Sequence, residues 1–401
     1  MTRRHACTWI ILLVCLGILG CPPAPVPTEP TGTASGQGTS PTQPTSLRAR
    51  VLEAIDLVRS RELEPVHGFW TVFHGIVGLG PEVMLHDRKG GRRLRALDYI
   101  REGGDLPGLK FEEKAEGLDV LNATDDDRFY AQGHQDQFVA EMAQWGVPID
   151  LEFRVHGRPP TFRAFVRYTK ARASIAKKQE LGWAILILAE YEGTDFAWTN
   201  KFGEALTFED LIRYEVESPM DPEESVRVGQ LPLACGGTHR LFGLSWAWHV
   251  HRQRGGARTG VWAQVADQTA HWKQTAKRLQ NPDGSFSTNW FVGRSSESDR
   301  GLRLTTTGHT LEWLALALSD EELREPWVEE SVRYLANLIL DMRNEAVEGG
   351  TLYHAIHGLI IYYARVWGTE ALGPNTPYLR LLPEWKQVGR AAGWDRPAAR
   401  R

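Results

Sequence analysis

The stretch Leu304-Thr-Thr-Thr-Gly-His-Thr-Leu-Glu-Trp-Leu-Ala-Leu-Ala-Leu318 places a histidine, His309, at the start of a nearly all-apolar segment. A segment that is apolar on every side is typical of a helix enclosed by other helices. The chain repeats this arrangement, so we expect six buried helices in all. The other five are predicted to open at Val66-His67, Gly133-His134, Gly182-Trp183, Thr238-His239 and Tyr353-His354.

An amphipathic segment precedes each apolar segment, with one face for solvent and one for a neighbouring helix. The first begins at Leu47, and the others cover residues 92–101, 162–175, 208–217, 261–279 and 321–342. Six outer-inner helix pairs predict an all-α fold. No polar capping repeat is visible at either end, so we expect the pairs to close into an (α/α)6 toroid, which leaves no apolar face uncovered.

The first residues have the pattern of an export signal. Thr2-Arg-Arg is positively charged, and the apolar run 9–20 is too short to span a bilayer comfortably. Ile18-Leu-Gly-Cys21 resembles the lipobox of bacterial lipoproteins, which implies a diacylglyceryl group on the sulfur of Cys21. We therefore expect the protein to be exported and lipid-anchored at the cell envelope, with a mild preference for the outer membrane.

The region after Cys21 is rich in Pro, Thr and Gly and has no apolar periodicity, as expected of a disordered tether. The predicted organisation is a signal peptide at 1–20, the lipidated Cys21 with its tether at 21–46, the toroid at 47–390 and a flexible tail at 391–401.

Composition limits the expected partners. The chain is 42% hydrophobic and 24% charged, and its formal net charge of -4 gives no reason to expect a nucleic acid or an anionic membrane surface. The chain also has 15 tryptophans, whose wide faces suit a thick helical core or stacking on a sugar. We expect two partners, the membrane through the lipid on Cys21 and a small-molecule or glycan ligand; the sequence identifies no protein partner.

One resemblance covers roughly residues 270–365. The segment Gln280-Asn-Pro-Asp-Gly284 resembles the turn of the prenyltransferase and squalene-cyclase repeat, and Tyr353-His-Ala-Ile-His-Gly-Leu359 resembles an inner-helix start of that family. The resemblance implies the toroid. It also raises a terpenoid or isoprenoid cyclase as an alternative function. Cyclases of this fold use an Asp-x-Asp-Asp motif, however, and Thr124-Asp-Asp-Asp127 has Thr first and lies in a polar insertion, so we expect a solvated loop there.

Protein prenyltransferases of the same fold bind zinc through Asp, Cys and His, with the Asp and Cys two residues apart. Here Leu233 and Gly237 occupy those positions around Cys235. Cys235 and His239 have an i, i+4 spacing that puts both on one helical face, but two ligands do not make a site. We therefore expect Cys235 to be a buried free cysteine, and we predict no metal and no cofactor.

Gly308-His-Thr-Leu-Glu-Trp313 resembles the Gly-His-x-x-Glu segment of the N-acylglucosamine 2-epimerase family, another (α/α)6 fold. The resemblance implies that His309 and Glu312 are catalytic acid-base residues. The residues themselves agree, since positions i and i+3 share a helix face and Glu312 is the only ionisable side chain from 310 to 318. A buried carboxylate needs a partner, and His309 is the nearest histidine. The alternative is a polar pair that only ties helices together.

In a closed ring the helix openings converge at one end, and polar groups that converge in an apolar funnel predict a binding site. The expected function is binding of a carbohydrate or other small ligand, with chemistry of the epimerase, hydrolase or lyase type if the protein is an enzyme. The alternative to any enzyme is a non-catalytic interaction module displayed at the envelope. The candidate ligand-binding residues are His74 (or His67), His134, Trp183, His239, His354 and His357.

Overall fold

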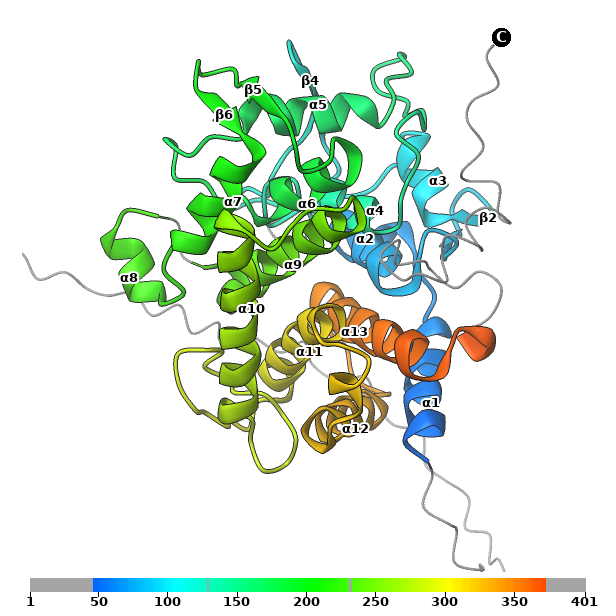
Figure 1. The fold of residues 1–401 in the computed structure, drawn as a ribbon. Coiled ribbons are helices and arrows are strands. Elements are labelled where there is room, and N and C mark those ends of the chain that lie inside the picture. Colours follow the sequence, from blue (N-terminus) through cyan, green and yellow to red (C-terminus); the bar gives the residue numbers. More distant parts are fainter. Residues whose placement is uncertain (1–45, 128–129, 231–232, 373–401) are drawn as a thin grey trace, which may run out of the picture. The chain divides into compact units, whose positions relative to one another are not determined.

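The computed structural model describes residues 46–127, 130–230 and 233–372, all within the second of the two units, 1–44 and 45–401, into which the chain divides. These residues form thirteen α-helices and three two-stranded antiparallel sheets (Figure 1), so the fold is mostly helical, as predicted. Within the same residues, no helix has the length and apolar character needed to cross a membrane. The predicted signal peptide, Cys21, tether and C-terminal tail lie outside the described residues.

Six helices are buried over most of their surface and correspond to the six predicted apolar segments. Each packs against the next in chain order, and the last packs against the first (Figure 1). They are α2 (Gly68–Leu79), α4 (Gln137–Gln144), α6 (Gly182–Tyr191), α9 (Thr238–Gln253), α11 (Arg300–Ala317) and α13 (Gly349–Trp367).

The remaining helices keep more of their surface in solvent, and most of them pack against the buried six. Helix α5 packs on α6, α10 on α9 and α7, and α12 on α1 and α11. Most of them match the amphipathic segments predicted from the sequence. They are α1 (Leu47–Arg59), α3 (Ala96–Arg101), α5 (Arg163–Arg172), α7 (Phe208–Glu217), α8 (Pro222–Arg227), α10 (Gly260–Leu279) and α12 (Pro326–Asp341).

Three hairpins join some of these helices, and none of them was predicted from the sequence. They are β1 (Met84–Asp87) with β2 (Arg92–Arg95), β3 (Phe111–Lys114) with β4 (Gly117–Val120), and β5 (Ala197–Thr199) with β6 (Ala205–Thr207). The predicted helix 92–101 is therefore wrong over its first four residues. Asp87 accepts a hydrogen bond from the Gly90 amide at 2.9 Å and Gly91 has a φ of 62°, which closes a turn and sends the chain back as β2.

Some of the buried helices begin where the sequence predicts, such as α6 at Gly182 and α9 at Thr238, but α11 and α13 begin earlier than their histidines predict. Helix α11 starts at Arg300, where the Asp299 side chain accepts from the Leu302 amide at 2.7 Å, so His309 lies in its third turn and not at its start. The polar residues before His309 fit a helix because the hydroxyls of Thr305 and Thr306 donate to the carbonyls four residues earlier. Likewise α13 begins at Gly349, which places His354 in its second turn.

Glycines allow the buried helices to approach closely. A Cβ atom on Gly243 of α9 would lie 2.2 Å from the carbonyl oxygen of Gly182 in α6. A Cβ atom on Gly358 of α13 would lie 2.9 Å from the backbone nitrogen of Glu312 in α11. At both positions the obstacle is backbone, which cannot rotate out of the way. These contacts explain why glycines occur at these positions in otherwise apolar helices.

We expect Gly243→Ala to lower the free energy of unfolding by about 1–3 kcal/mol, because the added methyl forces α6 and α9 apart. Gly293→Ala is the matched control, since its Cβ would have no neighbour closer than 3.9 Å and should change stability by no more than about 0.5 kcal/mol. Denaturant unfolding of both variants measures the difference. A Gly243→Ala protein as stable as the parent would contradict this packing.

Candidate functional site

Glu312 of α11 is a buried carboxylate that bonds to a neighbouring buried helix. Its two carboxylate oxygens bond to two histidines of α13, Oε2 to His354 Nδ1 at 2.9 Å and Oε1 to His357 Nδ1 at 2.5 Å. Positions 354 and 357 are i and i+3, so both imidazoles lie on the face of α13 that meets α11. All three side chains are at least 93% buried.

The prediction that Glu312 has a histidine partner is correct, but the partner is not His309. The Nδ1 atom of His309 bonds to the carbonyl oxygen of Thr305 at 2.8 Å, one turn earlier in α11. Side chains in a helix lean toward its N-terminus, which turns His309 back along its own helix while Glu312 reaches α13. The i, i+3 spacing therefore brings the two residues to one face without joining them.

Glu312 and His354 form a charged pair. Burial opposes the charge on His354, but the neighbouring Glu312 carboxylate outweighs burial and raises the pKa of His354 to about 9. Burial also opposes the charge on Glu312, yet the attraction of His354 and the hydrogen bonds from both histidines hold its pKa below the usual range. Near neutral pH the pair is an imidazolium and a carboxylate.

Two histidines beside this pair are held neutral. Burial, together with the positive charge of His354, lowers the pKa values of His74 and His309 well below the usual value. Each donates its Nδ1 hydrogen to a backbone carbonyl, His309 to Thr305 and His74 to Trp70 at 2.7 Å, because a carbonyl can only accept. In both neutral rings Nε2 is therefore the basic nitrogen.

A fully buried part of the cluster contains Glu141 of α4, which was not among the residues predicted from the sequence. Its Oε1 accepts from Gln137 Nε2 at 3.0 Å and lies 3.5 Å from His74 Nε2 and 3.9 Å from His354 Nε2. Burial raises the pKa of Glu141 well above its ordinary value. The spacing of Gln137 and Glu141, i and i+4 in a predicted buried helix, was the available signal.

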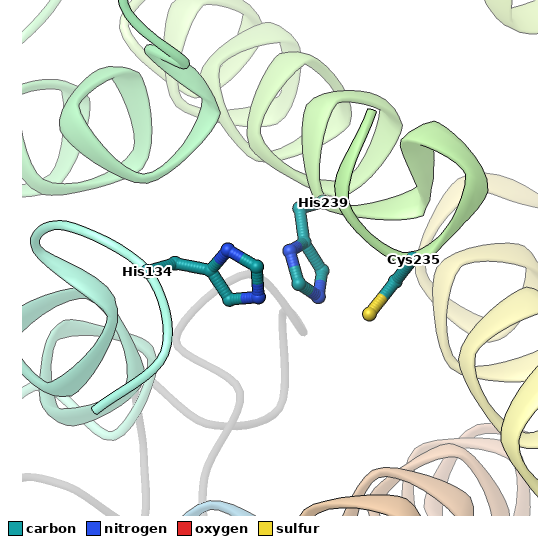
Figure 2. A group of neighbouring side chains, drawn as sticks. All are labelled: His134, Cys235 and His239. Atoms are coloured by element: carbon teal, nitrogen blue, oxygen red, sulfur yellow. The ribbon is translucent and has the colours of Figure 1, made fainter. Parts of the chain in front are cut away.

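The other end of the cluster lies nearer to solvent and contains His134, Glu180, Cys235 and His239. The carboxylate of Glu180 lies between the two imidazoles, with Oε2 3.5 Å from His134 Nδ1 and Oε1 3.7 Å from His239 Nδ1. His134 and Glu180 keep 25% and 27% of their side-chain surface exposed, so solvent reaches this end. Burial lowers the pKa of His239 to about 4. Figure 2 shows the rings of His134 and His239 close together, with the Cys235 sulfur beside His239.

The chain reaches Cys235 through a tight turn, Ala234–Gly237, in which Cys235 and Gly236 have φ values of 45° and 61°. Helix α9 follows directly and presents His239 one turn after the cysteine. Trp183 of α6 packs over the His239 ring at a centroid distance of 4.6 Å. Backbone geometry, rather than the helix spacing considered in the sequence analysis, therefore brings Cys235 to His239.

The structure brings the predicted site residues into one cluster. Of the two alternatives His67 and His74, only His74 belongs to it, because His67 is exposed and precedes α2. The loop Asp125–Asp127 is not part of the cluster; Asp125 and Asp126 are exposed, as predicted. The cluster contains His74, His134, Trp183, His239, His309, Glu312, His354 and His357, joined by Gln137, Glu141, Glu180 and Cys235.

We expect the Glu312–His354 pair to make stability depend on pH above neutrality. The folded-state pKa of His354, about 9, exceeds its ordinary value of 6.5, so its contribution to the free energy of unfolding is complete below pH 6.5 and is lost as pH rises to about 9. Denaturant unfolding from about pH 6 to about pH 10 should show this fall. His354→Gln should show a smaller fall. An equal fall in both proteins would contradict the ion pair.

Other charged and titratable groups face His354 and belong in the same experiment. They are His309 of α11, His74 of α2, Glu141 of α4 and His239 of α9. The three histidines have lowered pKa values and stay neutral over the tested range. Glu141 has a raised pKa and lies 3.9 Å from His354 Nε2, so Glu141→Gln measures its share of the pH dependence.

Comparison with protein-family models, curated proteins and solved structures finds no match to this chain. The resemblances to the prenyltransferase and squalene-cyclase repeat and to the N-acylglucosamine 2-epimerase family therefore stay predictions. The function has to be argued from the geometry of the cluster.

Proposed function

We propose that the protein binds a small polar ligand, such as a carbohydrate, and carries out acid-base chemistry on it at the centre of an (α/α)6 toroid. Support for the toroid comes from the cyclic order of helix packing. Helix α2 packs on α4, α4 on α6, α6 on α9, α9 on α11, α11 on α13, and α13 again on α2. A series of helices that ends on its own first member has no uncovered apolar end.

The observation that carries the function is a charged histidine next to a neutral one. The rings of His354 and His309 lie 4.3 Å apart between centroids. Glu312 holds His354 as an imidazolium, which can donate a proton, while Thr305 bonds to His309 Nδ1, so that the basic Nε2 of His309 can accept one. Neighbouring titratable groups whose environments push their pKa values apart are the usual arrangement of a general acid and a general base.

In this proposal Glu312 is a positioning residue, and His309 and His354 are the catalytic pair. This changes one prediction from the sequence, in which Glu312 was itself an acid-base group. Two tryptophans support a ligand with a broad face, since Trp183 packs over His239 and the Trp290 ring lies 6.0 Å from that of His309. Aromatic faces of this kind stack on sugar rings.

We propose further that the protein acts at the cell envelope, anchored by lipid on Cys21. The support is the sequence alone, namely the Ile18-Leu-Gly-Cys21 motif after an apolar run and before a Pro-rich segment. A tether of this composition would hold the folded unit away from the membrane surface.

An isoprenoid ligand is the second candidate, and Glu141 is the observation in its favour. A cyclase of the squalene type needs a carboxyl group that is kept neutral so that it can protonate an alkene. Glu141 is fully buried, and burial raises its pKa well above the ordinary value, which favours the protonated form. The exposed Asp125 and Asp126 cannot serve in this way. The class of ligand that the protein binds therefore distinguishes the carbohydrate-binding function from the isoprenoid-binding function.

A thermal-shift screen against sugars, uronates and isoprenoids tests the proposal. We expect a polar sugar-like ligand to stabilise the protein, by about 2.7 kcal/mol at 100 times its dissociation constant. The stabilisation should disappear in His309→Ala and persist in His271→Ala, an exposed histidine on α10. Loss of the shift together with normal helicity in His309→Ala would place the ligand at the cluster.

Other outcomes of the same screen favour the alternatives. Stabilisation by isoprenoids that disappears in Glu141→Gln would favour the cyclase-like function. No stabilisation by any class, with every variant folded, would contradict a ligand site and favour a non-catalytic interaction module.

A further inference from the structure

Outside the proposed acid-base pair, the strongest feature of the molecule is a set of metal-ligand side chains at the solvent end of the cluster. His134, Cys235 and His239 each offer one ligand atom, and these atoms all lie within 4.8 Å of one another (Figure 2). They come from the loop before α4, the turn at Ala234–Gly237 and the start of α9. His134 and His239 are 105 positions apart in the chain, so only the fold brings the three residues together.

We propose that His134, Cys235 and His239 bind a zinc ion, with Glu180 positioning both imidazoles. Thiolate and imidazole are the ligands that zinc prefers, and three protein ligands leave a fourth position open for water or a ligand. This goes beyond the proposed acid-base function, and neither inference requires the other.

The orientation of the histidines supports the site. Glu180 faces the Nδ1 atoms of both rings, at 3.5 Å for His134 and 3.7 Å for His239. A carboxylate that accepts from Nδ1 leaves Nε2 as the metal-binding nitrogen, which is how carboxylates commonly orient zinc-bound histidines. Figure 2 shows one nitrogen of each ring turned toward the side on which the Cys235 sulfur lies.

His239 provides an independent sign that something is bound. Its side chain is 96% buried, yet within the described residues neither ring nitrogen has a hydrogen-bond partner. Buried polar atoms are almost always satisfied, so two unsatisfied nitrogens on one ring require an explanation. A metal on Nε2, with the Nδ1 hydrogen drawn to Glu180, satisfies both.

The distances require only small side-chain movements. In a tetrahedral site with bonds of about 2.0–2.3 Å, ligand atoms lie about 3.5 Å apart. Separations of up to 4.8 Å therefore close by rotation of side chains, and His134, which keeps a quarter of its surface exposed, has room to move. When the ion binds, the Cys235 thiol gives its proton to solvent as the sulfur-metal bond forms.

Two other groups of side chains meet the same distance limit but have their ligand atoms engaged. In the group His74, Glu141 and His354, the His74 Nε2 atom accepts from Gln137 Nε2 at 3.1 Å and Glu141 Oε1 accepts from the same amide. In the group His239, His309 and His354, the last is paired with Glu312 as a cation. A cationic imidazole does not bind a metal.

Titration of the metal-stripped full chain with Zn²⁺ and Co²⁺ tests the site. We expect one tightly bound ion per chain, and in the Co²⁺ form the thiolate-to-metal charge-transfer absorption and strong visible bands of a tetrahedral site. Cys235→Ser should abolish the charge-transfer absorption. Glu180→Gln should weaken Zn²⁺ affinity by about 10–100-fold, since an amide cannot orient both rings.

Matched variants separate this site from other sources of metal binding. His271→Asn removes an exposed histidine and should bind Zn²⁺ like the parent protein. Because Cys7, Cys15 and Cys21 are the other thiols of the full chain, C7S/C15S/C21S should keep the absorption. If Cys235→Ser fails to fold, His134→Asn gives the same test at a partly exposed position, by loss of affinity.

Three results would overturn the proposal. These are no stoichiometric Co²⁺ spectrum in the folded parent, an unchanged spectrum in Cys235→Ser, or loss of the spectrum in C7S/C15S/C21S. If the protein binds zinc but no sugar stabilises it in the thermal-shift screen, the result would support the metal site alone. This outcome keeps the test of the metal separate from the test of the proposed function.

Discussion

One constraint organises the buried helices: the carboxylate of Glu312 has to stay charged inside an apolar core. Moving an unpaired carboxylate out of water costs several kcal/mol, and Glu312 is 93% buried. Two histidines from α13 meet this need, and one of them becomes a cation in doing so. The charge on His354 then helps to keep His74 and His309 neutral. One buried negative charge thereby sets the protonation of the histidines around it.

The helices must approach closely for this network to form. Glu312 reaches His354 and His357 because Gly358 allows α13 to approach the backbone of α11, and Gly308 does the same from the α11 side, where a Cβ would lie 2.8 Å from Ala355. Larger residues would move the imidazoles away from the carboxylate. The small residues of these helices thus serve packing and electrostatics together.

Much of the fold could be predicted from apolar periodicity, because buried helices leave a strong pattern. The bounds of α7 and the start of α6 agree with the prediction, and the convergence of the histidines was anticipated. The start of α11 was not anticipated. Thr305 and Thr306 are polar residues of a kind that is typical of loops, but their hydroxyls donate to carbonyls within the helix. The hairpins were missed because each strand has only three or four residues and no long alternation.

The pairing within the site could not be predicted from spacing along one helix. His309 and Glu312 are close in sequence, yet Glu312 pairs across helices, and which rotamer each side chain adopts follows from the neighbouring helix. Glu180 gives no sequence signal because it lies in a polar segment just before α6. His134 joins Cys235 and His239 only through tertiary packing, which is why the spacing of the latter two indicated an incomplete metal site.

Nitrogen-15 NMR of the histidine side chains at about pH 8 measures their protonation states directly, because imidazole nitrogen shifts distinguish charged rings and the two neutral tautomers. At this pH we expect His354 to be doubly protonated, and His74 and His309 to be neutral with the proton on Nδ1. Assignment rests on the loss of single signals in His354→Gln and His309→Ala. A neutral His354, or a charged His309, at that pH would contradict this expectation.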